Sequence, residues 1–324
     1  MSTRTAALTG LLLLASCGGG GTEPVPPTIP LPPNPVGTVT IEACLGLGGV
    51  SERCTLVQDA SACTGDRCRR LAIVFSGGEQ GCATGAGYAT VMAGYAARGY
   101  AVACVNAFET SAGSGAIPYV DEAARYDLAV KTATTGAWAK AFWSGEHLLL
   151  EGISHGASAP VILMARTTLD DQPHWKGSGV TAGCFFDGSY DQAASASLLA
   201  TGNGGAACTS PVPSGRWLER YCGAGATAAT CDLTAVPKAL EDTITAAPAA
   251  NFAVHEFRLF ECGSALGACA GDILPAGPIE ALCSALDAAP AHRCTFTSLP
   301  TDGHLTCYAS QYDQCRSWFD GLTP

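Results

Sequence analysis

The stretch LLLEGISHG, residues 148–156, joins a short apolar run to a serine flanked by glycines. The run at 147–150 predicts a buried strand, and residues 157–168 predict a helix. A sharp strand-to-helix turn holds such a serine at the edge of a sheet, and the glycines let the two backbones approach closely. A serine alcohol is a poor nucleophile unless it is exposed beside a base. Ser154, in the single G-x-S-x-G match of the chain, is therefore the candidate nucleophile.

Predicted strands alternate with predicted helices from about residue 38 onward. The expected strands are 39–43, 55–57, 71–75, 101–105, 147–150, 179–186, 252–260 and 294–299, and the expected helices are 87–97, 121–134, 157–168 and 305–319. Continuous apolar runs such as 71–75 are typical of strands that are covered on both faces. The alternation predicts an α/β fold, with a mainly parallel central sheet and helices on both faces.

Residues 188–250 interrupt this alternation. The segment is rich in Ala, Gly and Thr and contains three cysteines. A connection of this length is unusual inside a compact domain. We interpret it as an inserted cap or lid held together by disulfides, and the alternative is a second small domain with no role at the site.

His304 is the histidine best placed to act as a base for Ser154. It lies in a loop just after the last predicted strand, 294–299. His155 adjoins the serine and points elsewhere, while His147 and His255 fall at or within strands. The other two histidines, at 174 and 292, lie in polar connections that contain proline, where a solvated side chain is the simpler interpretation.

The serine motif, a later carboxylate and the late His304 occur in the order that is found in the α/β-hydrolase superfamily, and residues 38–324 resemble that superfamily. The resemblance implies an α/β-hydrolase fold with Ser154 as nucleophile and His304 as base. The cysteine content and the predicted export make the chain similar to secreted esterases and polyester depolymerases within it.

The resemblance also implies an oxyanion hole that is formed by backbone N–H groups. One donor is the residue after the nucleophile, His155. The second comes from a glycine-containing loop after an earlier strand, and Gly78 and Glu79 in the segment FSGGEQG, 75–81, are the candidates. This loop lacks the Lys-Ser/Thr pair of a phosphate-binding loop.

The acid that orients the histidine has three candidates. Asp272, in the segment GDILP, resembles the superfamily's Asp that is followed shortly by Pro, and it is the first choice. In the superfamily this residue usually stands only a few positions past the strand, so 262–269 is interpreted as an intervening disulfide loop. Asp187, after the preceding strand, and Glu261, at the strand end itself, are the alternatives. Each carboxylate has a simpler interpretation as a turn or capping residue.

These residues predict a serine hydrolase that cleaves carboxylic esters through an acyl-enzyme on Ser154, with no metal or organic cofactor. The substrate is expected to be a small-molecule or polymeric ester, and the protein is expected to be a monomer. Two alternatives stay open. One is a peptidase or acyltransferase with the same triad, and the other is a non-catalytic surface-binding lipoprotein with a hydrolase fold.

The first residues predict export. Arg4 gives a positive start, and Ala6–Ala15 is a short apolar segment. The following LASCG resembles the lipobox of bacterial lipoproteins, in which cleavage before the cysteine leaves a lipidated residue, here Cys17. We therefore expect a lipoprotein signal peptide at 1–16, a Gly/Pro-rich tether at 17–37 and a lipid-anchored body in the cell envelope. Gly18 in the second mature position resembles the outer-membrane sorting choice of a cell with two membranes, so the expected location is the outer membrane or the cell surface or periplasm.

The chain has 17 cysteines, which leaves an even number once Cys17 is set aside. An exported chain can pair such thiols in disulfides, so no free thiol is expected in the body. Zinc is disfavoured because no C-x-x-C pair is present. Proximity in the sequence alone favours pairing Cys262 with Cys269 and Cys307 with Cys315.

Composition limits the possible partners. Hydrophobic residues make up 48% of the chain and charged residues 14%, which excludes a disordered protein. The net charge of −11 argues against nucleic acid or anionic headgroups as partners. No apolar run in the body reaches the length of a bilayer span. Membrane contact is therefore expected only through Cys17.

Overall fold

The computed structural model describes the residues that form the central sheet and its helices. They are residues 37–45, 51–58, 63, 67–77, 82, 87–105, 130, 133–165, 180–190, 230, 232, 256–263, 276–288 and 293–323. The predicted signal peptide, nearly all of the tether and most of the predicted cap lie outside this set. The predicted helix at 121–134 also falls almost entirely outside it.

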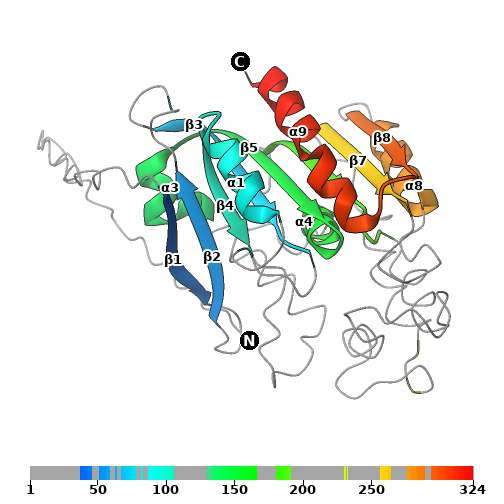
Figure 1. Ribbon diagram of the computed structural model, residues 1–324, viewed down its shortest axis with the longest axis horizontal. Coiled ribbons are helices and arrows are strands. Elements are labelled where there is room, and N and C mark those ends of the chain that lie inside the picture. Colours follow the sequence, from blue (N-terminus) through cyan, green and yellow to red (C-terminus); the bar gives the residue numbers. More distant parts are fainter. Residues whose placement is uncertain are drawn as a thin grey trace, which may run out of the picture. The chain divides into compact units, whose positions relative to one another are not determined.

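The described strands form one eight-stranded sheet in the order β1-β2-β4-β3-β5-β6-β7-β8 (Figure 1). They are β1 (Gly37–Leu45), β2 (Ser51–Gln58), β3 (Cys68–Phe75), β4 (Tyr100–Val105), β5 (Trp143–Ile153), β6 (Val180–Phe186), β7 (Glu256–Cys262) and β8 (Arg293–Leu299). Strands β1 and β2 pair antiparallel, and β2 pairs antiparallel with β4. The other neighbouring pairs, in the order β4-β3-β5-β6-β7-β8, are parallel. The expected mainly parallel sheet is confirmed.

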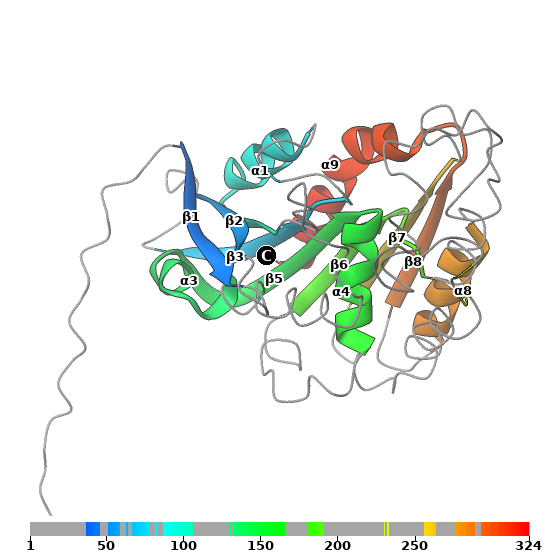
Figure 2. The same ribbon diagram turned by 90° about the horizontal axis from the view of Figure 1, so that it is seen from below.

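The central strands are buried on both faces, as their apolar runs predict. All residues of β4 are buried, and so are Leu71–Phe75 of β3 and Leu148–Ile153 of β5. Helices α1 (Tyr88–Ala96) and α9 (His304–Leu322) cover one face, and α3 (Ala137–Phe142), α4 (His155–Ala165) and α8 (Ala276–Asp287) cover the other (Figure 2). The sheet is therefore the middle layer of three.

Helix α9 returns across the sheet against the direction of the strands. It begins just after β8 ends, at the carboxyl edge, and its last residues lie near the start of β3. There Arg70 contacts Asp320 at 3.0 Å, donates to the Thr323 carbonyl oxygen at 2.5 Å, and lies over the Tyr100 ring. Arg98 also contacts Asp320, at 2.6 Å. The end of α9 is thus anchored at the amino edge of the sheet, and its start lies at the carboxyl edge.

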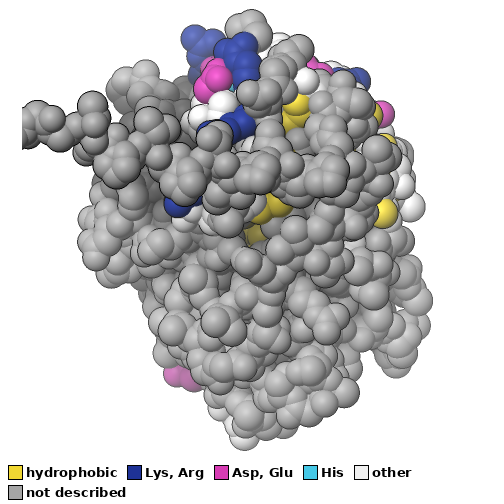
Figure 3. Space-filling model, turned by 90° about the vertical axis from the view of Figure 1, so that its left-hand side faces the viewer, with side chains coloured by type: hydrophobic (Ala, Val, Ile, Leu, Met, Phe, Trp, Pro, Cys, Tyr) yellow, Lys and Arg dark blue, Asp and Glu magenta, His cyan; other side chains and the backbone are white. Residues whose placement is uncertain are grey.

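Charged side chains of both signs gather together on the face shown in Figure 3. On strands β3 and β5, the exposed Arg69 and Glu146 form an ion pair with an N–O distance of 2.6 Å. An exposed pair of this kind adds little to stability. Among the described residues, no helix combines the length and apolarity that a membrane crossing requires.

Five disulfides lie within the described residues, and they join Cys63–Cys68, Cys82–Cys104, Cys184–Cys315, Cys262–Cys307 and Cys283–Cys294. The pairs expected from proximity in the sequence, Cys262 with Cys269 and Cys307 with Cys315, are wrong. The end of β7 and the start of α9 are neighbours in space although 45 residues separate the two cysteines. Cys315, further along the same helix, reaches β6 instead.

Candidate active site

Ser154 lies at a tight turn between β5 and α4. Its φ of 59° is in the left-handed region, which costs a non-glycine residue free energy, and such strained residues cluster at active sites. The Ser154 N–H donates to the Phe186 carbonyl oxygen at 2.8 Å, and the Ser154 carbonyl accepts the N–H groups of Ala157 and Ser158. Ser154 is partly exposed, whereas Ile153 and His155 are buried at 1% and 2% exposure. The turn thus brings only the serine toward solvent.

The two glycines of the motif are required by the packing of this turn. A Cβ on Gly152 would lie 2.1 Å from the carbonyl oxygen of Gly156. A Cβ on Gly156 would lie 2.4 Å from the carbonyl oxygens of both Phe75 and Ser76. These contacts are with backbone atoms that cannot rotate away, so the close approach of strand and helix predicted from the sequence is confirmed.

The ends of β5 and β6 are in register at the carboxyl edge of the sheet. Ile153 pairs with Phe186, and Phe186 pairs in turn with Phe260 of β7. Ser154 directly follows β5 and Asp187 directly follows β6, so the two residues lie side by side where the chain leaves the sheet. Asp187 also adopts a left-handed turn, with a φ of 52°, and its N–H donates to the Phe260 carbonyl oxygen at 2.7 Å.

His304 is the first residue of α9 and lies against Asp187. Its Nδ1 donates to Oδ2 of Asp187, since a carboxylate oxygen can only accept. Both side chains are buried, at 5% and 3% exposure. The other carboxylate oxygen, Oδ1, accepts the backbone N–H of Cys262 at 3.3 Å. The carboxylate is therefore held from two sides and holds the imidazole in turn.

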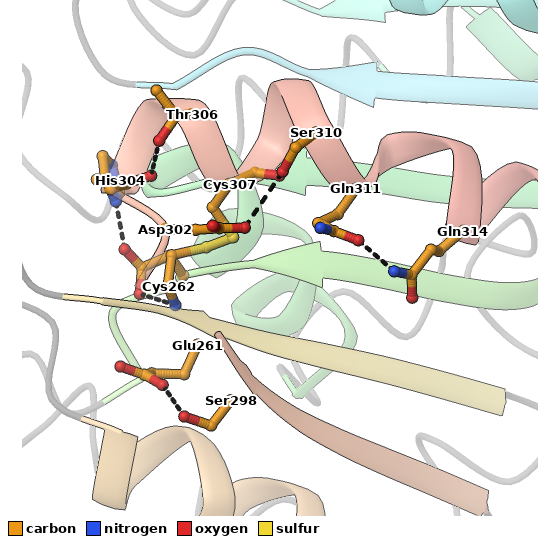
Figure 4. The surroundings of a disulfide bond; sticks show 12 residues. Glu261, Cys262, Ser298, Asp302, His304, Thr306, Cys307, Ser310, Gln311 and Gln314 are labelled. Atoms are coloured by element: carbon orange, nitrogen blue, oxygen red, sulfur yellow. Dashed lines mark hydrogen bonds and ion pairs between the residues drawn. A yellow bond between two sulfur atoms is a disulfide. The ribbon is translucent and has the colours of Figure 1, made fainter. Parts of the chain in front are cut away.

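Asp187 thus has the position beside His304 that the sequence analysis assigned first to Asp272. That first choice is corrected to the alternative, Asp187, and Asp272 itself lies outside the described residues. Glu261 is not the partner of His304 either. Its carboxylate accepts the hydroxyl of Ser298 and lies on the opposite side of β7 from His304 (Figure 4). Neighbouring side chains of a strand alternate between faces, and it is Cys262 that faces α9.

Several solved structures with this architecture are esterases, and another is a putative dipeptidyl aminopeptidase IV from Bacteroides ovatus, 11% identical with a TM-score of 0.54 and a match that covers 88% of this chain and 35% of that one. Est1E from Butyrivibrio proteoclasticus is 11% identical with a TM-score of 0.56, and the match covers 87% of this chain and 98% of that one. Esterase 2 from Thermogutta terrifontis is 15% identical with a TM-score of 0.56, covering 90% and 97%. Carboxyl esterase 2 from the fungus Tuber melanosporum is 15% identical with a TM-score of 0.55, covering 88% and 83%. The chain has the α/β-hydrolase fold. No protein-family model and no curated protein sequence matches it.

Only one of the predicted oxyanion donors lies within the described residues. His155 is the first residue of α4, so its backbone N–H belongs to a helix amino terminus next to Ser154. Gly78 and Glu79 lie outside the described residues. Their neighbour Gly77 is described, and its N–H donates to the Tyr88 hydroxyl of α1 at 2.6 Å. Tyr88 therefore fixes the start of the predicted oxyanion loop.

A buried carboxyl group behind the serine was not identified from the sequence. Glu151 of β5 has no exposed surface, and Tyr95 of α1 donates a hydrogen bond to it. Burial raises the pKa of Glu151 to about 7, against the lowering effects of that hydrogen bond and of the positive charge of Arg316 on α9. The sequence signal was a lone Glu in the otherwise apolar run LLLEGI.

Proposed function

We propose that this protein is a serine hydrolase that cleaves carboxylic esters through an acyl-enzyme on Ser154. The observation that carries the proposal is the buried His304–Asp187 pair at the same sheet edge as the strained, partly exposed Ser154. Several of the similar structures are named as esterases, which supports an ester as the substrate class, and one is named as a putative dipeptidyl aminopeptidase.

In the proposed mechanism, the Ser154 hydroxyl attacks the ester carbonyl and transfers its proton to His304 Nε2. Asp187 accepts the Nδ1–H, which keeps the imidazole in the required tautomer and stabilises it once it is charged. The backbone N–H of His155 and one N–H from the 78–79 loop bind the tetrahedral oxyanion. His304 then protonates the leaving alcohol, and water releases the acid by the reverse sequence of proton transfers.

The decisive experiment combines a fluorophosphonate probe with p-nitrophenyl esters of graded chain length and a matched amide series. Ser154→Ala is expected to abolish labelling and to lower ester hydrolysis by several orders of magnitude. Ser144→Ala, which removes an exposed serine from the same strand, is the matched control and should behave like the wild type. Wild-type protein that neither reacts with the probe nor cleaves any substrate would establish the non-catalytic alternative, and faster amide cleavage would establish a peptidase.

The acid is tested in the same assay. Asp187→Asn is expected to lower kcat by roughly 10⁴-fold, because a neutral amide can hold the wrong imidazole tautomer. Asp272→Asn and Glu261→Gln serve as controls and are expected to remain within about tenfold of the wild type. A large loss in Asp272→Asn with a mild effect in Asp187→Asn would contradict the assignment.

We also propose that the protein is exported and anchored through a lipidated Cys17. The five disulfides of the described residues support this, because such bonds persist in oxidising compartments. The intact mass of the mature protein tests the anchor. A mature chain that starts at another residue, or without lipid, would overturn it.

A further inference from the structure

The Cys262–Cys307 disulfide lies directly beside the His304–Asp187 pair. Cys262 is the last residue of β7, and its backbone N–H is the donor to Asp187 Oδ1. Cys307 is in the first turn of α9, three residues after His304. Figure 4 shows the bond between strand and helix, with His304 at the start of the same helix. A closed path therefore runs from His304 through the helix and the disulfide to Cys262, and back through Asp187.

Besides the disulfide, the start of α9 is held by backbone contacts and by the buried side chain of Tyr308, which follows Cys307 and packs against Phe186 and Tyr88. The residue before the helix is Gly303, which has no side chain to cap the first turn. Gly263 donates to the Leu299 carbonyl oxygen at 2.9 Å, and a Cβ on Gly263 would lie 2.0 Å from the Pro300 carbonyl oxygen. The segments that leave β7 and β8 are thus packed backbone to backbone, and the disulfide is the covalent link between β7 and α9.

A second disulfide holds the same helix further along. Cys315 lies eight residues after Cys307, or about two helical turns, and it pairs with Cys184 of β6. The far end of α9 is also bound by Arg70. Loss of the Cys262–Cys307 bond would therefore leave the body of α9 attached to the sheet and release mainly the turn that carries His304.

We infer that the Cys262–Cys307 disulfide is a positioning element for the triad, which fixes the His304 imidazole against the Asp187 carboxylate. The buried sulfur atoms touch no substrate and take no part in proton transfer. Their effect is geometric, because they hold the first turn of α9 against the strand end whose N–H orients Asp187. The kinetic consequence rests on the proposed ester hydrolysis, but the effect on the His304–Asp187 hydrogen bond does not.

The two disulfides of α9 make a matched comparison. The Cys184–Cys315 bond spans 131 residues and the Cys262–Cys307 bond 45. Because a cross-link that closes a longer loop restricts the unfolded chain more, losing Cys184–Cys315 should destabilise the fold at least as much. A purely structural role for both bonds thus predicts that activity follows stability. A positioning role predicts the opposite order for activity.

The test compares two double variants, Cys262→Ala with Cys307→Ala and Cys184→Ala with Cys315→Ala. For each, kcat and KM are measured on a p-nitrophenyl ester well below the unfolding temperature, and proton NMR follows the low-field Nδ1–H resonance of His304. The first pair is expected to lose that resonance and roughly 10²-fold in kcat, with KM nearly unchanged, since misplacement of a reacting group by about 1 Å costs this much. The second pair is expected to keep the resonance and a near wild-type kcat.

Retention of both the resonance and kcat in the first pair would overturn the inference. Loss of the resonance in a protein that cleaves no ester in any form would support the positioning role and refute the proposed function. If the first pair does not fold, the wild-type protein is titrated with a reductant, and the reduced cysteines are alkylated and mapped by mass spectrometry. The resonance must then disappear with reduction of Cys262–Cys307, and its survival after that reduction would overturn the inference.

Discussion

Replacing Glu151 by Gln is expected to remove a pH dependence of folding stability between pH 4.5 and about 7. The carboxyl group is completely buried between β5 and the helices α1 and α9. Burial raises its pKa from 4.5 to about 7, while the hydrogen bond from Tyr95 and the charge of Arg316 oppose the rise. An isosteric amide can still accept that hydrogen bond but cannot ionise.

The sign follows from proton binding. The folded protein holds the Glu151 proton more tightly than the unfolded chain, so this contribution to stability is complete below pH 4.5 and is lost as the pH rises to about 7. Each pKa unit corresponds to about 1.4 kcal/mol. The rise of the pKa from 4.5 to about 7 therefore corresponds to a loss of about 3 kcal/mol in the free energy of unfolding across that interval. Glu151→Gln should not show this loss.

Urea unfolding at a series of pH values from 4 to 8 measures this effect. Relative to the wild type, Glu151→Gln should gain stability as the pH rises, by about 3 kcal/mol in total. Glu146→Gln is the control, because Glu146 is exposed on the same strand and its hydrogen bond from Arg69 lowers its pKa below the interval. Its curve should run parallel to the wild type. A parallel curve for Glu151→Gln as well would refute the reasoning.

Two further substitutions, one of them paired with a control glycine, test the packing around the turn. Gly156→Ala should prevent stable folding or cost several kcal/mol, because its Cβ meets backbone oxygens at 2.4 Å, whereas Gly321→Ala near the end of α9 meets open space and should stabilise by up to about 1 kcal/mol. Denaturant midpoints separate the two, and equal effects would contradict the contact argument. Tyr88→Phe leaves the Gly77 N–H without its acceptor and should cost roughly 1–3 kcal/mol, with a lower kcat in the ester assay if that loop binds the oxyanion. Unchanged stability and kcat would show that Tyr88 does not hold the loop.

The fold could be predicted from the sequence because local signals and the final architecture agree. The run LLLEGISHG predicts a buried strand, a tight turn and the start of a helix. In the structure these are the end of β5, the turn at Ser154 and the start of α4. Strand β5 nevertheless begins at Trp143, four residues before the expected His147. Residues 144–146 of β5 are exposed, so they lack the continuous apolar pattern on which the prediction depended.

The disulfides could not be predicted, because their partners come together only through the order of strands in the sheet. Cys307 and Cys315 lie on one helix but pair with β7 and β6, which are neighbouring strands under that helix. Two cysteines eight residues apart on a helix are about 12 Å apart along its axis, which is too far for a disulfide. The predicted helix at 305–319 already excluded that pair, and proximity in the sequence was the wrong criterion.

The position of the carboxylate beside His304 follows from how strands meet the carboxyl edge. Neighbouring strands lie about 4.8 Å apart, so a residue that directly follows β6 stands one strand away from Ser154, and a residue that directly follows β7 stands two. Helix α9 crosses above β5, β6 and β7, and its first residue, His304, contacts the nearer carboxylate, Asp187. Asp187 also leaves the sheet through a left-handed turn, which Asp tolerates better than most residues, and Gly188 follows it. An Asp-Gly pair directly after a buried strand was visible in the sequence, whereas Asp272 comes ten residues beyond the end of β7. Distance from the strand end was therefore the better guide to the carboxylate beside His304 than the proline that follows Asp272.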